Sequence, residues 1–219
     1  MKKLYIFDLD GTLVNSIGDL ADSMNTVLER HGFPVHEVEA YKFFVGNGTL
    51  KLVERALPED KRTQEMIVRL HEEFSEVYRD NAVRKTVPYE GIKELLGTLK
   101  DRGCKLAVAS NKPHEFSVKI TETLFGKDVF DVIYGKREGV PTKPSPEIML
   151  DIMKDIGVRA DECVHSGDSA VDIMTAKNAG IDCVVGCTWG FRPREELTQA
   201  GAQLIADKAQ DILTLTEKL

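Results

Sequence analysis

The C-terminal two-thirds of this 219-residue chain repeats one pattern, and the repeat limits the possible folds more than any other feature. In each copy an amphipathic helical stripe is followed by a glycine and then by a short apolar run. The copies have their stripes at 92–99, 148–156 and 171–174, their glycines at Gly103, Gly157 and Gly180, and their apolar runs at 105–109, around Val164 and at 181–185. A fourth, weaker copy has Gly201 before 204–206, and Leu4 to Phe7 forms one more apolar run. Glycine just past a helix end takes the left-handed conformation that terminates it. Continuous apolar runs are typical of strands covered on both faces, so the alternation predicts an α/β fold with a parallel sheet.

Residues 15–84 do not follow this alternation of helical stripes and apolar runs. They contain two helical stripes, at 17–28 and 67–77, and little that is typical of a strand. Ser16 followed by Asp19 has the spacing of a capping box that would start the first helix. We therefore predict a Rossmann-like core made of residues 1–14 and 85–219, with an inserted α-helical cap domain at 15–84.

Charge and hydropathy exclude several classes of function. The formal net charge is −7 and there is no basic run, which argues against a nucleic-acid partner. The apolar runs are far shorter than the ~20 residues that span a bilayer, so we expect no membrane partner. Nothing typical of a signal peptide precedes the first run, and three of the four cysteines lie in apolar runs, so we expect reduced thiols and a cytoplasmic protein.

Polar residues follow the ends of the predicted strands. Asp8 and Asp10 follow the first strand, Ser110-Asn111-Lys112 follow the second, and Asp168 and Asp172 follow the third, while Lys143 lies in a Pro-containing loop. The carboxyl ends of parallel strands meet at one edge of a sheet, where open α/β sheets bind ligands. We therefore expect these side chains to form one site.

The charges of this set point to a cation. Four aspartates against Lys143 leave three negative units, which would repel one another without a counter-ion. The candidate ligands are all oxygens, which favours a hard ion such as Mg²⁺. A hydroxyl and an ammonium suit phosphoryl oxygens, and a carboxylate can attack phosphorus to form an aspartyl-phosphate. A second carboxylate two positions away can handle the leaving-group proton.

Four segments resemble the motifs of the haloacid dehalogenase-like (HAD) superfamily, in order and spacing. They are Phe7-Asp8-Leu9-Asp10-Gly11-Thr12-Leu13-Val14, Ser110-Asn111-Lys112, Lys143-Pro144-Ser145-Pro146-Glu147, and Gly167-Asp168-Ser169 through Asp172. The insertion at 15–84 looks like the helical cap of the phosphoglycolate phosphatase and β-phosphoglucomutase branch.

The resemblance implies Mg²⁺-dependent phosphoryl transfer and a role for each matching residue. Asp8 would be the nucleophile, and Asp10 the general acid and then base. Asp8, the backbone carbonyl of Asp10 and Asp168 would bind the metal, supported by Thr12 and by Asp172 acting through water. Ser110, Asn111 and Lys143 would bind the phosphoryl group.

The same resemblance narrows the reaction. The acid at Asp10 argues against a dehalogenase and a phosphonatase, and Thr12 is usual in phosphatases, whereas mutases of this branch often carry Val there. Gly46-Asn47-Gly48 falls where related caps place a substrate-specificity loop, and Thr49 after it begins a predicted helix. Basic side chains flank this loop and would neutralise a second anionic group, namely Lys42, Lys51 and Arg55.

We therefore predict a phosphatase, acting as a monomer or homodimer, for a small phosphorylated metabolite such as 2-phosphoglycolate. Three alternatives stay open: a β-phosphoglucomutase-like phosphomutase, a sugar phosphatase or pyrophosphatase of the same family, and a non-enzymatic, receiver-like switch that stores an aspartyl-phosphate.

Overall fold

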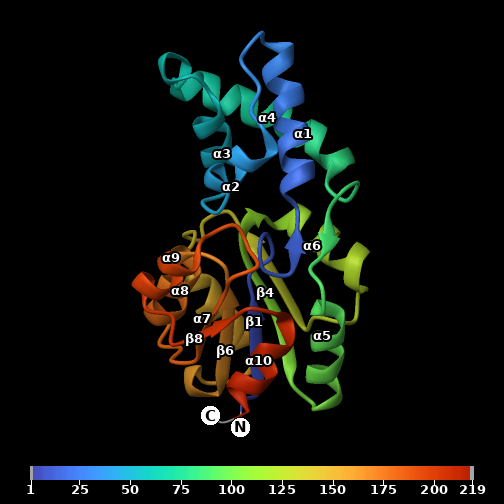
Figure 1. The fold of residues 1–219 in the computed structure, drawn as a ribbon, viewed down its shortest axis with the longest axis vertical. Helices are drawn as coiled ribbons and strands as arrows, with labels where there is room; N and C mark the ends of the chain where they lie inside the picture. Colours follow the sequence, from blue (N-terminus) through green and yellow to red (C-terminus); the bar gives the residue numbers. More distant parts are fainter. Residues whose placement is uncertain (1, 218–219) are drawn as a thin grey trace.

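Six parallel strands form the central sheet in a computed structural model that describes residues 2–217 (Figure 1). Their order is β5-β4-β1-β6-β7-β8. The bounds are β1 Leu4–Phe7, β4 Lys105–Pro113, β5 Val132–Lys136, β6 Cys163–Gly167, β7 Val184–Cys187 and β8 Leu204–Ala206. The predicted α/β fold with a parallel sheet is confirmed, although β5 was not foreseen and β7 begins at Val184 rather than at 181.

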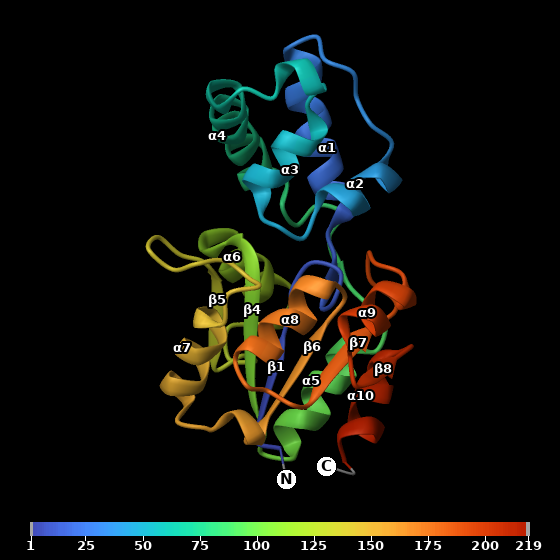
Figure 2. The same ribbon diagram turned by 90° about the vertical axis from the view of Figure 1, so that its left-hand side faces the viewer.

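Both faces of the sheet are covered, because alternate residues of each strand enter different apolar cores. In β1, Tyr5 and Phe7 belong to one core, and Leu4 and Ile6 belong to the other. The first core is covered by α5 (Ile92–Asp101), α6 (His114–Phe125) and α10 (Ala209–Thr216). The second is covered by α7 (Glu147–Ile156), α8 (Ala170–Asn178) and α9 (Arg194–Ala200). Figure 2 shows these three helices in front of the sheet. Burial on both faces explains why the strands are continuously apolar.

The insertion is helical and lies above the carboxyl ends of the strands (Figure 2). It contains α1 (Ile17–Arg30), α2 (Val38–Phe44), α3 (Thr49–Ala56) and α4 (Gln64–Asn81), and a 3-10 turn at Glu59–Lys61; a second such turn, Ala160–Glu162, precedes β6. The predicted stripes of α1 and α4 face each other, with Leu20 and Met24 buried in the same core as Leu70 and Phe74. The predicted helix at Thr49 is present as α3.

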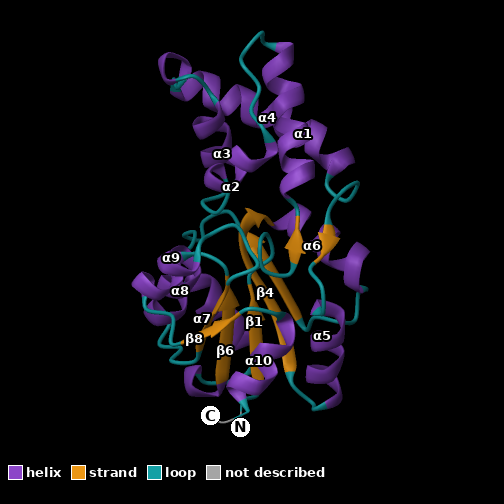
Figure 3. Ribbon diagram, in the orientation of Figure 1, coloured by secondary structure: helices purple, strands orange, loops and turns teal. Residues whose placement is uncertain are grey.

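Two antiparallel segments join the insertion to the core (Figure 3). β2 (Val14–Asn15) pairs with β3 (Val87–Pro88). The predicted domain bound at 14/15 falls within β2 and the one at 84/85 falls shortly before β3, and the division into two domains stays a prediction.

The capping box at Ser16 and Asp19 is absent. Helix α1 begins at Ile17 as expected, but the Ser16 side chain makes no cap hydrogen bond and donates instead to Asp10. The Asp19 carboxylate accepts from the backbone N–H groups of Lys85 and Thr86. The spacing of these two residues predicted a helix-capping box. Instead, Ser16 joins the first linker to Asp10, and Asp19 joins α1 to the second linker at Lys85 and Thr86.

Two smaller expectations also have outcomes within residues 2–217. Cys163, Cys183 and Cys187 are buried, Cys104 is partly buried, and all four are free thiols. None of the described helices combines the length and apolar character needed to cross a bilayer.

Candidate active site

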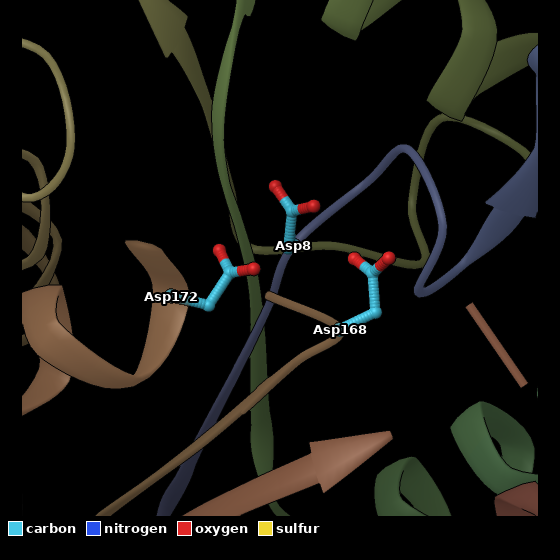
Figure 4. Close-up of side chains that lie close together, drawn as sticks. All are labelled: Asp8, Asp168 and Asp172. Atoms are coloured by element: carbon cyan, nitrogen blue, oxygen red, sulfur yellow. The ribbon is translucent and has the colours of Figure 1, made fainter. Parts of the chain in front are cut away.

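Three buried carboxylates meet where the strand order reverses. Asp8 directly follows β1, the strand flanked by β4 and β6, and chain connections leave in opposite directions from this point. One carboxylate oxygen from each of Asp8, Asp168 and Asp172 lies within 4.8 Å of the others, and Figure 4 shows the three side chains close together, with Asp8 between Asp172 and Asp168. Such a switch point is the usual ligand site of an open α/β sheet.

Lys143 joins two of these carboxylates. Its ammonium nitrogen lies 2.7 Å from Asp8 Oδ1 and 2.6 Å from Asp172 Oδ1, and it also donates to the Ala109 carbonyl at 2.8 Å. The side chain is only 2% exposed, so water screens these ion pairs weakly. Lys143 therefore fixes the positions of Asp8 and Asp172.

The pKa values reveal a deficit of positive charge. Burial, with a contribution from the nearby Asp172 charge, raises the pKa of Asp8 to about 7 even though Lys143 opposes the shift. Burial and the charges of Asp172 and Asp8 raise the pKa of Asp168 well above its ordinary value. Burial alone would raise the pKa of Asp172 as well, but Lys143 and neighbouring donors lower it. The negative charges of the ionised Asp8 and Asp168 carboxylates are therefore not fully balanced by positive groups of the protein. Oxygen ligands of this kind fit a divalent cation.

Two of the carboxylates are oriented by close neighbours. Asp168 accepts from the Thr12 hydroxyl at 3.2 Å and from the Phe191 backbone N–H at 2.7 Å. A Cβ atom at Gly190 would lie 2.2 Å from the Cβ atom of Asp168, so only glycine permits this approach. Asp172 uses Oδ2 to accept from Ser169 in the capping box of α8. Thr12 thus contacts the site through Asp168, whereas Asp172 itself lines the carboxylate side of the site; their supporting roles toward a metal stay predictions.

Asp10, the second carboxylate of the first motif, forms an ion pair with Lys112, a cation that the charge count from the sequence did not include. The ammonium of Lys112 lies 3.0 and 2.9 Å from the two oxygens of Asp10, and its side chain is 1% exposed. Including Lys112, the four aspartates leave two negative units rather than three. The lysine was visible in the second motif, but nothing in the local sequence indicated its partner 102 residues away.

The two other residues expected to bind phosphate differ in what they contact. Ser110 is buried and lines the cavity beside Asp8. The Asn111 amide donates to the carbonyls of Gly46 and Lys143, both at 3.1 Å, and its oxygen accepts from the Lys143 backbone N–H. Asn111 therefore joins the Lys143 loop to the cap and also lines the cavity beside Asp8, and its phosphate contact stays a prediction.

The predicted specificity loop reaches the site through its glycines. Gly46 and Gly48 line the cavity above Asp8, whereas the Asn47 side chain accepts from Arg55 at 2.8 Å. Lys51 is 46% exposed, is paired with Glu54 and does not line that cavity. Its role in substrate selection stays a prediction.

Two arginines share the carbonyl groups at the end of α2. Arg55, from the cap, donates to the carbonyls of Phe43 and Phe44. Arg192, from the core, donates to those of Lys42 and Val45. The last carbonyls of a helix have no partner within it, so both guanidinium groups satisfy exposed acceptors. Arg192, a residue that the sequence did not single out, thereby connects the core to the end of α2, directly before the predicted specificity loop.

Two adjoining cavities open at Asp8 and Asp10. The first, which we call the carboxylate cavity, is lined by Lys143, Asp168 and Asp172. The second, the cap cavity, extends between Ser110 and Lys112 below and Leu20, Val45, Gly48, Thr49 and Leu52 above. Because Asp8 borders both cavities, a ligand bound in them would have one end against Asp8.

The fold and this site define a class, that of α/β proteins with a parallel sheet, a helical insertion after the first strand and an aspartate at the end of that strand. Residues 5–185 match the family described as haloacid dehalogenase-like hydrolase. A phosphoglycolate phosphatase from Colwellia psychrerythraea is 35% identical over 217 residues, covering 97% of this chain and 96% of the relative. One from Psychrobacter arcticus is 34% identical over 205 residues, covering 90% and 88%. A crystal structure described as a predicted phosphoglycolate phosphatase from Haemophilus somnus has 32% identity and a TM-score of 0.90, with 98% of each chain covered.

The chain belongs to the haloacid dehalogenase-like hydrolase family. Within that family it lies in the phosphoglycolate phosphatase-like branch, which makes it a phosphatase with a small phosphorylated substrate.

Proposed function

We propose that this enzyme hydrolyses a small phosphomonoester similar to 2-phosphoglycolate, in a Mg²⁺-dependent reaction through an aspartyl-phosphate on Asp8. One observation carries the proposal: Asp8 borders both cavities, is held by Lys143 at 2.7 Å, and has Asp10 beside it. A nucleophile, a phosphoryl-binding cation and a proton carrier are thus at one place.

The residues around the carboxylate cavity fit a magnesium ion. Asp8, the backbone carbonyl of Asp10 and Asp168 would hold it, with Asp172 acting through water. When bound, Mg²⁺ would neutralise charge on the phosphoryl oxygens. Lys143 and the Ser110 hydroxyl would bind those oxygens from the protein side.

In the first step a carboxylate oxygen of Asp8 attacks phosphorus, and the bond from phosphorus to the ester oxygen breaks. Asp10 gives its proton to that oxygen, which leaves as an alcohol. In the second step a water oxygen attacks the phosphoryl group, Asp10 takes the water proton, and the bond from phosphorus to Asp8 breaks. Inorganic phosphate is released and Asp8 is regenerated.

The cap supports a small substrate. Leu20, Val45 and Leu52 line the cap side of the cap cavity, so the part of the substrate beyond the phosphoryl group would lie against them. Relatives named phosphoglycolate phosphatase over most of this chain favour the same size of substrate. We propose that residues 15–84 act as a lid over the core made of 1–14 and 85–219 and exclude water during the first step.

The test is phosphate release from 2-phosphoglycolate with Mg²⁺ and with a chelator. We expect release only with metal, and at least a ~10³-fold lower rate in Asp8→Asn, whose amide is a poor nucleophile. Asp182→Asn, on the exposed surface of the core, is the matched control and should keep the wild-type rate. Equal rates in Asp8→Asn and wild type would reject the nucleophile, and isomerisation of a hexose phosphate without net phosphate release would indicate a mutase.

A further inference from the structure

Lys112 is a buried cation of the cap cavity with no role in the steps above. It lies at the end of β4, and all the hydrogen bonds of its ammonium within residues 2–217 go to Asp10. The ring of Tyr78, from the cap helix α4, lies below the ammonium at 4.8 Å from its centroid. Cap and core together thus enclose this charge.

Burial of an ammonium is costly, and packing does not require one here. An apolar side chain would fill the space against Tyr78, whose neighbours Phe74 and Phe116 are aromatic. Lys112 neutralises the Asp10 carboxylate, which also accepts from the Ser16 hydroxyl. An ammonium has three donors, so Lys112 can bind a second anionic group as well as Asp10.

The position of Lys112 relative to the reaction suggests which group that is. With the phosphoryl group at Asp8, the ester oxygen must face Asp10 to receive its proton. The next atoms of the substrate then extend past Asp10 into the cap cavity, where the Lys112 nitrogen lies 2.9 Å from the Asp10 carboxylate. Without this cation, Asp8 and Asp10 would repel a substrate whose far end is negative.

The other basic residues near the loop do not compete for this role. Lys51 is paired with Glu54, and Lys42 is paired with Glu39, outside the cap cavity. Arg192 lines the carboxylate cavity instead, and its N–H groups bind the carbonyls of Lys42 and Val45 at the end of α2. The remaining walls above Lys112 are largely apolar.

We propose that Lys112 binds a carboxylate carried on the carbon next to the ester oxygen, so that the enzyme selects phosphorylated small hydroxy acids over neutral phosphomonoesters. This inference rests on the proposed function and names the group that distinguishes its substrate. Lys112 is then a specificity-determining residue.

The experiment compares two substrates that differ in that group alone: 2-phosphoglycolate and 2-hydroxyethyl phosphate, in which an alcohol replaces the carboxylate. For the wild type we expect kcat/KM to favour the acid by at least about tenfold, a factor equivalent to 1.4 kcal/mol. Lys112→Met, which keeps the length of the side chain without its charge, should reduce this ratio by about tenfold or more. Lys112→Arg should retain most of it.

Three results would overturn the proposal. A wild-type ratio near one is the first, and it applies even if Lys112→Met does not fold. The second is an equal loss of kcat/KM on both substrates in a folded Lys112→Met, which would show that Lys112 only positions Asp10. The third is a loss of selectivity in Lys51→Met but not in Lys112→Met. Failure of the proposed function is distinct, because the wild type would then release no phosphate from either ester.

Discussion

Replacing Lys143 by methionine tests how strongly the site depends on its central ion pairs. The ammonium is 2% exposed and joins Asp8 at 2.7 Å to Asp172 at 2.6 Å. Removing one partner of a buried ion pair costs about 3–5 kcal/mol, because the remaining charge has no compensation. We expect a loss of that size in the free energy of unfolding of the metal-free protein at pH 8.

The loss should be smaller at pH 5. The pKa of Asp8 is raised to about 7, so below that pH its carboxyl already holds a proton and only the pair with Asp172 is lost. Above pH 7 the Asp8 carboxyl of the wild type releases this proton. The variant lacks the Lys143 charge that lowers the pKa of Asp8, so its Asp8 carboxyl has a still higher pKa and retains the proton. The cost at pH 8 should therefore exceed that at pH 5 by about 1.4 kcal/mol, the equivalent of one pH unit.

The assay is urea denaturation of both proteins in chelator at the two pH values. Lys105→Met is the control, since Lys105 is 55% exposed and its pair with Asp131 should contribute less than about 1 kcal/mol at either pH. A Lys143→Met loss no larger than the control, or identical at pH 5 and pH 8, would refute the reasoning.

Two further predictions concern the metal and the cap. Because protons on Asp8 and on Asp168 compete with a cation, the apparent Mg²⁺ affinity measured by titration calorimetry should fall at least about tenfold per pH unit below 7; a pH-independent affinity would contradict this. Arg192→Ala removes charge-assisted hydrogen bonds to the carbonyls of Lys42 and Val45, each worth about 1.5 kcal/mol or more, so kcat/KM should fall at least about tenfold as the cap closes less often. Arg194→Ala, which breaks only a surface pair with Asp207, should leave kcat/KM unchanged. Equal kcat/KM values for the two variants would show that the contacts of Arg192 with the end of α2 do not contribute to activity.

The parts of the fold that the sequence predicts are those where burial is complete. β1 is fully buried on both faces, so its apolar run could be recognised without knowledge of its neighbours. β5 is a partly exposed edge strand with Gly135 and Lys136 at its end, and its composition does not distinguish it from a loop. β2 and β3 have two residues each and exist only through their pairing.

The parts of the site that the sequence predicts are those in motifs with fixed spacing. Asp8, Asp168 and Asp172 converge because the ends of neighbouring strands must meet. The partners of Lys112 and Arg192 lie far away in the chain and could be identified only in the folded protein. Lys51 lies next to the loop in sequence, but its place on α3 turns it toward Glu54.

The measurement that bears most directly on the mechanism is detection of the phosphorylated enzyme. Asp10→Asn incubated with p-nitrophenyl phosphate and Mg²⁺ should accumulate it, since nitrophenolate leaves without a proton while water attack has lost its base. After acid quench, mass spectrometry should place the phosphoryl group on the carboxyl of Asp8. Absence of any phosphoryl-enzyme, or its presence on another residue, would contradict attack by Asp8.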